Sequence, residues 1–124
     1  MWNWLKNLFS KNKDPLRFVK KALRITVGLV LVNNPQFTLP LSAGLAAIEA
    51  LLRDKQPADV VKLALDKALA ELAAKVSDNK VIQVEIRDLA NEINLEISGL
   101  PQDEQLVKIG EMVAEFRKTV EMYK

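Results

Sequence analysis

The amino-acid sequence predicts an all-α protein of about five helices. Apolar residues recur at three- and four-residue spacing along most of the chain, and helix start and stop signals interrupt that pattern at short intervals. The length of 124 residues is enough for one domain with a buried core, and 49% hydrophobic and 27% charged residues are typical of globular proteins.

Residues 1 to 13 predict a basic amphipathic helical arm. Trp2, Leu5 and Phe9 are spaced by three and four residues, with Trp4 and Leu8 beside them, so a helix here has one broad apolar face. Indole rings with lysines around them favour a lipid headgroup layer. Two other interpretations stay open: the rings pack on the protein's own core, or they contact a protein or nucleic acid.

Asp14 and Pro15 predict the start of a helix that runs to Val32 and ends at Asn33-Asn34-Pro35. Beyond Arg24 this helix is apolar all round, which predicts burial on most sides. Its two apolar stripes are Leu16, Val19, Leu23, Val27 and Val30, and Phe18, Ala22, Ile25, Leu29 and Val32.

The most apolar run, Ala22 to Val32, is too short for a single membrane span. As a helix it measures about 16 Å, roughly half of a ~30 Å hydrocarbon core. A re-entrant hairpin with residues 40 to 52 as its second arm stays open as an alternative. Otherwise we expect Ser42 to cap a helix through about Arg53, forming an apolar helical pair within residues 15 to 54.

Two amphipathic helices are predicted next. Pro57 begins one that runs to about Val76, and Asn79 caps another over residues 80 to 97. Their inward stripes are Val61, Leu65, Ala68, Leu69, Leu72 and Val76, and Ile82, Ile86, Leu89, Ile93 and Ile97. A β-hairpin over residues 82 to 97 is the competing interpretation, but residues 87 to 92 contain no Gly or Pro to make its turn.

A last helix is predicted after Gly99 and Pro101, with Gly99 in the left-handed conformation. Its seam is Leu106, Ile109, Val113, Phe116, Val120 and Tyr123. Short connections predict that residues 57 to 123 form an acidic antiparallel three-helix unit. The predicted organisation is therefore an arm over residues 1 to 13 and one helical domain over 14 to 124, with a sub-boundary at 54 to 57.

Charge is distributed unevenly along the chain. Residues 1 to 24 hold seven basic residues and one acidic residue, a net charge of +6, whereas residues 57 to 124 carry a net charge of −4. Such asymmetry indicates an anionic partner at the front. No secretion signal is recognisable, so we expect a cytoplasmic protein that attaches peripherally to a membrane.

Most catalytic and metal chemistry has no residues to support it. The chain contains neither cysteine nor histidine, and its four glycines are isolated, so we expect no enzyme activity, no cofactor and no metal. Glu85, Asp88, Glu92 and Glu96 share one helix face, but they lie roughly 95° from the apolar stripe, so we expect a solvated surface row.

The candidate site is therefore a binding surface, for an anionic membrane or a protein partner. It comprises Trp2, Trp4, Leu5, Lys6, Leu8, Phe9, Lys11, Lys13, Arg17, Lys20, Lys21 and Arg24. We expect reversible docking on an anionic membrane surface. One alternative is a structural or adaptor subunit that self-associates head-to-tail, the basic front of one copy meeting the acidic back of another. The other is nucleic-acid binding through the ridge of Arg17, Lys20, Lys21 and Arg24.

Overall fold

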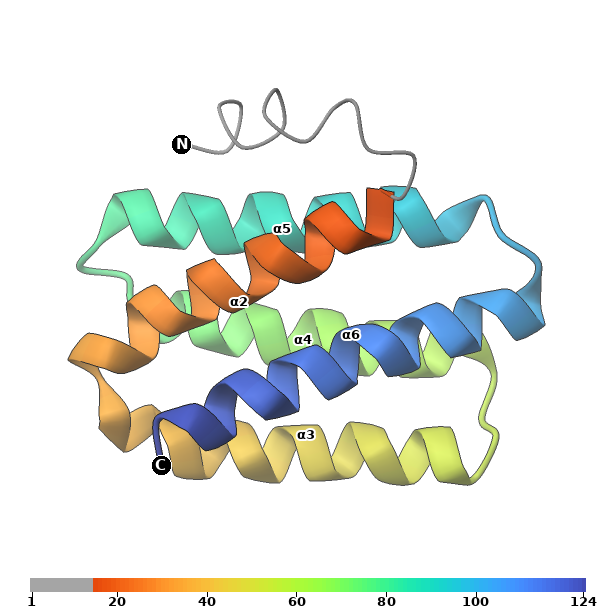
Figure 1. The fold of residues 1–124 in the computed structure, drawn as a ribbon, viewed down its shortest axis with the longest axis horizontal. Coiled ribbons are helices and arrows are strands. Elements are labelled where there is room, and N and C mark those ends of the chain that lie inside the picture. The colour runs from red at the N-terminus through yellow and green to blue at the C-terminus, as the bar shows by residue number, and fades with distance from the viewer. Residues whose placement is uncertain (1–14) are drawn as a thin grey trace.

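The computed structural model describes residues 15 to 124, which fold into five α-helices and one 3₁₀ helix without a strand in that range (Figure 1). In chain order these are α2 (Pro15–Asn33), η1 (Pro35–Phe37), α3 (Thr38–Arg53), α4 (Ala58–Lys75), α5 (Lys80–Ser98) and α6 (Gln102–Met122). The all-α prediction is confirmed, and residues 82 to 97 form a helix and not a hairpin. The predicted arm, residues 1 to 13, lies outside the described residues.

The five helices form a closed ring. α2 packs against α5 and α6, α3 packs against α4 and α6, and α4 packs against α5. The order around the ring is therefore α2, α5, α4, α3, α6 and back to α2. α4 also contacts α6 across the bundle. Because α2 and α6 both run from right to left in Figure 1, these two neighbours are parallel.

The structure does not confirm the helix groupings predicted from the sequence. α2 and α3 do not form a pair, because α6 lies between them and contacts both. The predicted three-helix unit is only partly present: α4 and α5 are neighbours, but α6 packs mainly against α2 and α3 and contacts α5 little. Short connections alone therefore do not determine which helices are neighbours in this fold.

One apolar core is shared by all the described α-helices. The largest fully buried side chains are Leu23 and Leu31 of α2, Leu45 and Ile48 of α3, Leu65, Leu69 and Leu72 of α4, Ile86, Leu89, Ile93 and Ile97 of α5, and Phe116 of α6. Leu23 and the buried residues of α4, α5 and α6 belong to the stripes that the helical spacing predicts, whereas Leu31 belongs to neither predicted stripe of α2. Burial of such stripes supplies most of the stability of helices of this length.

Several helix ends follow the predicted local signals. The Asn79 side-chain oxygen accepts a hydrogen bond from the backbone N–H of Ile82 at 3.2 Å, which confirms the predicted cap of α5. Asp103 and Glu104 lie in the first turn of α6, where the helix dipole favours negative charge.

Two other helix ends differ from the sequence prediction. Ser42 does not cap α3, because η1 leads directly into a helix that begins at Thr38, whose hydroxyl donates to the Pro35 carbonyl at 2.9 Å. Pro40 falls in the first turn of that helix, where a missing N–H costs nothing. Gly99 is not left-handed either, since its φ is −84° and Leu100 N–H closes the turn onto Ile97.

Lys55 provides a left-handed helix end that the sequence does not signal. Its φ is +55°, and the backbone N–H groups of Lys55 and Gln56 donate to the carbonyls of Leu52 and Leu51. This is the Schellman arrangement, which usually has glycine at the left-handed position. It reverses the chain between α3 and α4 within four residues.

The prediction that α2 is buried on most sides beyond Arg24 is wrong for one face. Val27, Val30 and Leu31 are completely buried, but Ile25 and Leu29 are 41% and 38% exposed. Val32, at the end of the same stripe, is 60% exposed. Only α5 and α6 pack closely along α2, so its remaining face is left uncovered by the described helices.

We predict that the inner face of α2 is essential for stability. Leu23→Ala, at a completely buried position, should lower the free energy of unfolding by about 2 to 5 kcal/mol. Leu63→Ala, at a position 69% exposed on α4, should change it by less than about 0.5 kcal/mol. Urea unfolding followed by circular dichroism measures both, and equal small effects would contradict the shared core.

Candidate functional site

The outward face of α2 changes character along its length. At 100° per residue, Arg17, Lys21 and Arg24 lie within about 60° of one another, and Ile25, Gly28 and Val32 continue the same face. The first half of this face is therefore basic and the second half is aliphatic. We call it the α2 outer face, comprising Arg17, Lys20, Lys21, Arg24, Ile25, Gly28, Leu29 and Val32.

Two of its cations are paired with carboxylates of α6. The Lys20 ammonium lies 3.3 Å from Glu111 Oε1, and Arg24 Nε donates to Glu115 Oε1 at 2.9 Å. In both pairs the residues are 91 positions apart, which confirms that α2 and α6 run parallel. The Arg24 side chain stays 51% exposed, so its guanidinium can still meet an anion from outside.

A groove between α2 and α6 continues the aliphatic half. It has a volume of about 330 Å³ and is lined by Arg24, Ile25, Gly28, Leu29, Val32, Thr119, Met122 and Tyr123. Met122 is 66% exposed at its α6 edge. Gly28 allows the close approach of Tyr123, since a Cβ at Gly28 would lie 3.0 Å from the tyrosine hydroxyl oxygen. The groove is thus an open apolar surface with a cation at one end.

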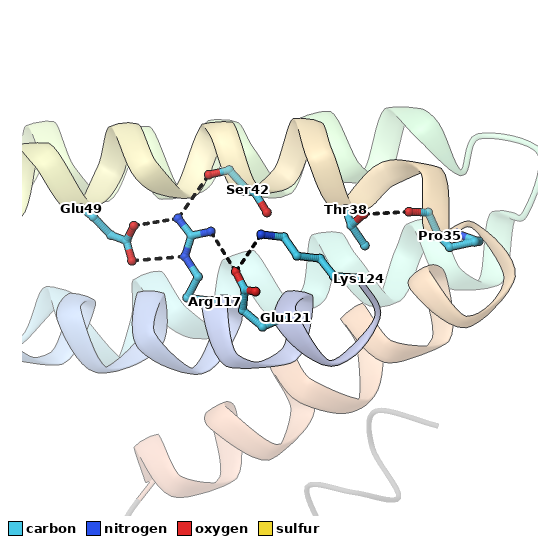
Figure 2. Close-up of polar contacts among 7 residues, drawn as sticks. All are labelled: Pro35, Thr38, Ser42, Glu49, Arg117, Glu121 and Lys124. Carbon is cyan, nitrogen blue, oxygen red and sulfur yellow. Dashed lines mark hydrogen bonds and ion pairs between the residues drawn. The ribbon is translucent and has the colours of Figure 1, made fainter.

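The opposite side of α6 is held to α3 by an arginine. Arg117 donates to Glu49 through Nη2 at 2.7 Å and through Nε at 3.3 Å, and Nη2 also donates to the Ser42 carbonyl at 3.2 Å (Figure 2). Glu121 lies 3.6 Å from Arg117 Nη1 and 3.1 Å from Lys124 Nζ. The Arg117 hydrogen bonds lower the pKa of Glu49 below its ordinary value. These contacts join two helices and leave no group directed at a ligand.

A second groove, between α4 and α5, contains one carboxylate. Its volume is about 310 Å³, and small apolar residues line it together with Asp66, Arg87 and Asn91. Burial raises the pKa of Asp66, while the Asn94 amide donates to both of its carboxylate oxygens at 3.1 and 3.2 Å. Asp66 is therefore already hydrogen-bonded by the protein itself.

The acidic row on α5 is not the solvated surface that the sequence predicts. Glu85 is only 8% exposed, and Asp88, Glu92 and Glu96 are half-buried. Glu85 lies one turn before Leu89, at the border of the buried stripe, so its stem is drawn toward the core. Within residues 15 to 124 no group of three or more acidic side chains is arranged to hold a metal ion.

The predicted site residues divide into two groups. Eight of them lie outside the described residues: Trp2, Trp4, Leu5, Lys6, Leu8, Phe9, Lys11 and Lys13. The other four lie on α2, with Arg17 and Arg24 exposed and Lys20 and Lys21 half-buried. The candidate set omits Ile25, Leu29, Val32 and Met122, which extend the surface. A helical projection of α2 places the first three beside the cations, which is the signal that could have found them.

Comparison with known proteins identifies no relative. No protein-family model matches the chain, and no curated protein and no solved structure matches it either. In the part of the chain that the structure describes, no helix combines the length and hydropathy needed to cross a bilayer.

We predict a pH-dependent contribution from the α3–α6 contact. Glu49→Gln should lower the free energy of unfolding by about 1 kcal/mol or less at neutral pH, because both partners are partly exposed. A carboxyl whose folded pKa is lowered stabilises the protein above its unfolded pKa and loses that effect as pH falls through the folded pKa. The difference from wild type should therefore begin to shrink below about pH 4 and disappear once the pH is below the lowered folded pKa of Glu49.

Urea titrations at about pH 7 and about pH 3 measure this difference. Glu71→Gln, at an exposed position on α4, is the control and should differ little from wild type at either pH. A deficit in Glu49→Gln of the same size at both values would contradict the ion-pair explanation.

Proposed function

We propose that this protein is a non-enzymatic helical protein that docks reversibly on an anionic membrane surface. The contact is made by the basic, Trp-containing residues 1 to 13 and by the α2 outer face that follows them in the chain. The observation that supports this most is the exposure of Ile25, Leu29 and Val32 directly beside Arg24. Cations beside exposed aliphatic side chains fit the headgroup and acyl boundary of a lipid leaflet.

The expected energies suit a reversible attachment. Each cation near an anionic leaflet contributes up to about 1 kcal/mol. Full burial of an aliphatic side chain contributes about 1.5 to 3 kcal/mol, and these three are already partly covered by the bundle, so each adds roughly half of that. After the cost of ordering the contact, association in the micromolar range is expected.

The same contacts make the two other candidate functions less well supported. Head-to-tail self-association would join the basic front of one copy to the acidic back of another, yet Lys20 and Arg24 already meet Glu111 and Glu115 within one chain. Nucleic-acid binding would use the cations but not the aliphatic half of the face, which phosphates and base edges do not need. An anionic lipid surface uses both halves.

Vesicle binding tests the proposal. Leu29→Glu/Val32→Glu should weaken co-sedimentation with phosphatidylserine-containing vesicles about tenfold or more, because two aliphatic contacts are replaced by charges of the lipid's own sign. Val60→Glu/Leu63→Glu is the matched control, since it makes the same two types of substitution at positions 43% and 69% exposed on α4, which does not pack closely against α2.

The control should bind within about twofold of wild type, because its two acids lie away from the proposed contact. Neither protein should pellet with vesicles of phosphatidylcholine alone. Equal weakening by the two double variants would show that overall charge, and not the α2 outer face, governs binding. Absence of wild-type binding at low salt would reject the function.

A further inference from the structure

One face of α5 combines acidic and aliphatic side chains in an unusual way. It carries Val81, Val84, Glu85, Asp88, Glu92, Leu95 and Glu96, which lie within about 120° of one another on the helix. We call this the α5 mixed face. Val81 and Leu95 are each 69% exposed and Val84 is 52% exposed, whereas none of the four acidic residues is exposed. The usual exposure of acidic and aliphatic residues is thus reversed here.

One carboxylate oxygen on this face, in Glu85, lacks a hydrogen-bond partner. Its side chain is buried, and its Oε2 atom has no hydrogen-bond partner. A buried carboxylate oxygen without a partner is destabilising unless a cation or a hydrogen-bond donor approaches it. A partner for this face must therefore bring a cation or a hydrogen-bond donor for Glu85 and apolar side chains for the valines and leucine.

We infer that the partner is residues 1 to 13 of the same chain. This segment contains Lys6, Lys11 and Lys13 and no acidic residue, so its charge complements the acidic row. Trp2, Leu5 and Phe9 give it an apolar stripe at helical spacing, which can cover Val81, Val84 and Leu95. The segment matches the α5 mixed face in both charge and hydrophobicity.

The position of α2 makes this contact accessible. α2 packs against α5 and runs in the opposite direction, so the first turn of α2 lies beside the C-terminal half of α5 (Figure 1). α5 has 19 residues and is about 28 Å long. As a helix, the 13 residues of the segment are about 20 Å long, enough to lie along most of α5. The covalent link to α2 keeps the segment close to α5, whereas a second copy or another protein has no such link.

This contact would regulate the docking described above, and that consequence rests on the proposed function. The same apolar stripe cannot lie on α5 and in a lipid leaflet at once. The α5 mixed face thus holds the segment in water, and an anionic surface competes for it. Any change that loosens the segment from α5 should increase vesicle binding.

Paramagnetic broadening tests the contact in the full-length protein without lipid. Both tryptophans lie in the segment, so the two indole N–H signals report on it alone, and the absence of native cysteine allows a nitroxide at a single chosen position. A label at Asn91→Cys, exposed at the edge of the α5 mixed face, should broaden the indole signals strongly. A label at Leu63→Cys on α4 should broaden them much less.

Val84→Glu/Leu95→Glu in the Asn91→Cys protein should remove the broadening and raise acrylamide quenching of the tryptophans at least twofold. Val60→Glu/Leu63→Glu should leave both unchanged, which controls for added charge. Indole signals that are equally sharp with either label would overturn the inference. Broadening that appears only between labelled and ¹⁵N-labelled copies would also overturn it, in favour of a second copy as the partner.

Vesicle binding by the same variants separates this inference from the proposed function. Indole broadening in water together with no vesicle binding would reject the function and keep the contact. Vesicle binding by wild type without any broadening in water would reject the contact and keep the function. If both hold, Val84→Glu/Leu95→Glu should bind anionic vesicles several-fold more tightly than Val60→Glu/Leu63→Glu.

Discussion

The burial of the inner side of α2 between α5 and α6 is the constraint on which the rest of the structure depends. Leu23, Val27 and Val30 are completely buried there, and this packing closes the ring of helices. The same packing determines which residues of α2 remain outside. Because its neighbours lie on two sides only, a face that begins with cations and ends with aliphatic residues is left on the surface.

Basic and acidic residues that are far apart along the chain lie next to each other in the folded molecule. The basic front and the acidic back are brought together, since α2 and α6 lie parallel and pair Lys20 with Glu111 and Arg24 with Glu115. Such exposed pairs contribute little to stability. They also hold Arg24 at one end of the apolar groove that α2 and α6 build together.

Local signals in the sequence predict the helices well, because caps, prolines and apolar spacing act within a few residues. The stripe from Ile86 to Ile97 and the Asn79 cap are examples. Helix pairing is not predictable in this way: α6 separates α2 from α3 because of apolar faces distant in the sequence. The same limit applies to the site. The cations are recognisable from composition, but the exposure of Ile25 and the burial of Glu85 depend on which helices pack beside them.

The central claim is that the α2 outer face enters the interface of an anionic leaflet. Nitroxide labels placed singly at Ile25→Cys, Leu29→Cys and Val32→Cys, with Leu63→Cys as reference, measure this directly through their collision rates with a water-soluble nickel complex. The account predicts that phosphatidylserine vesicles lower the collision rate at all three α2 positions and leave it unchanged at position 63. Equal collision rates with and without vesicles at the α2 positions, in protein that is bound, would contradict it.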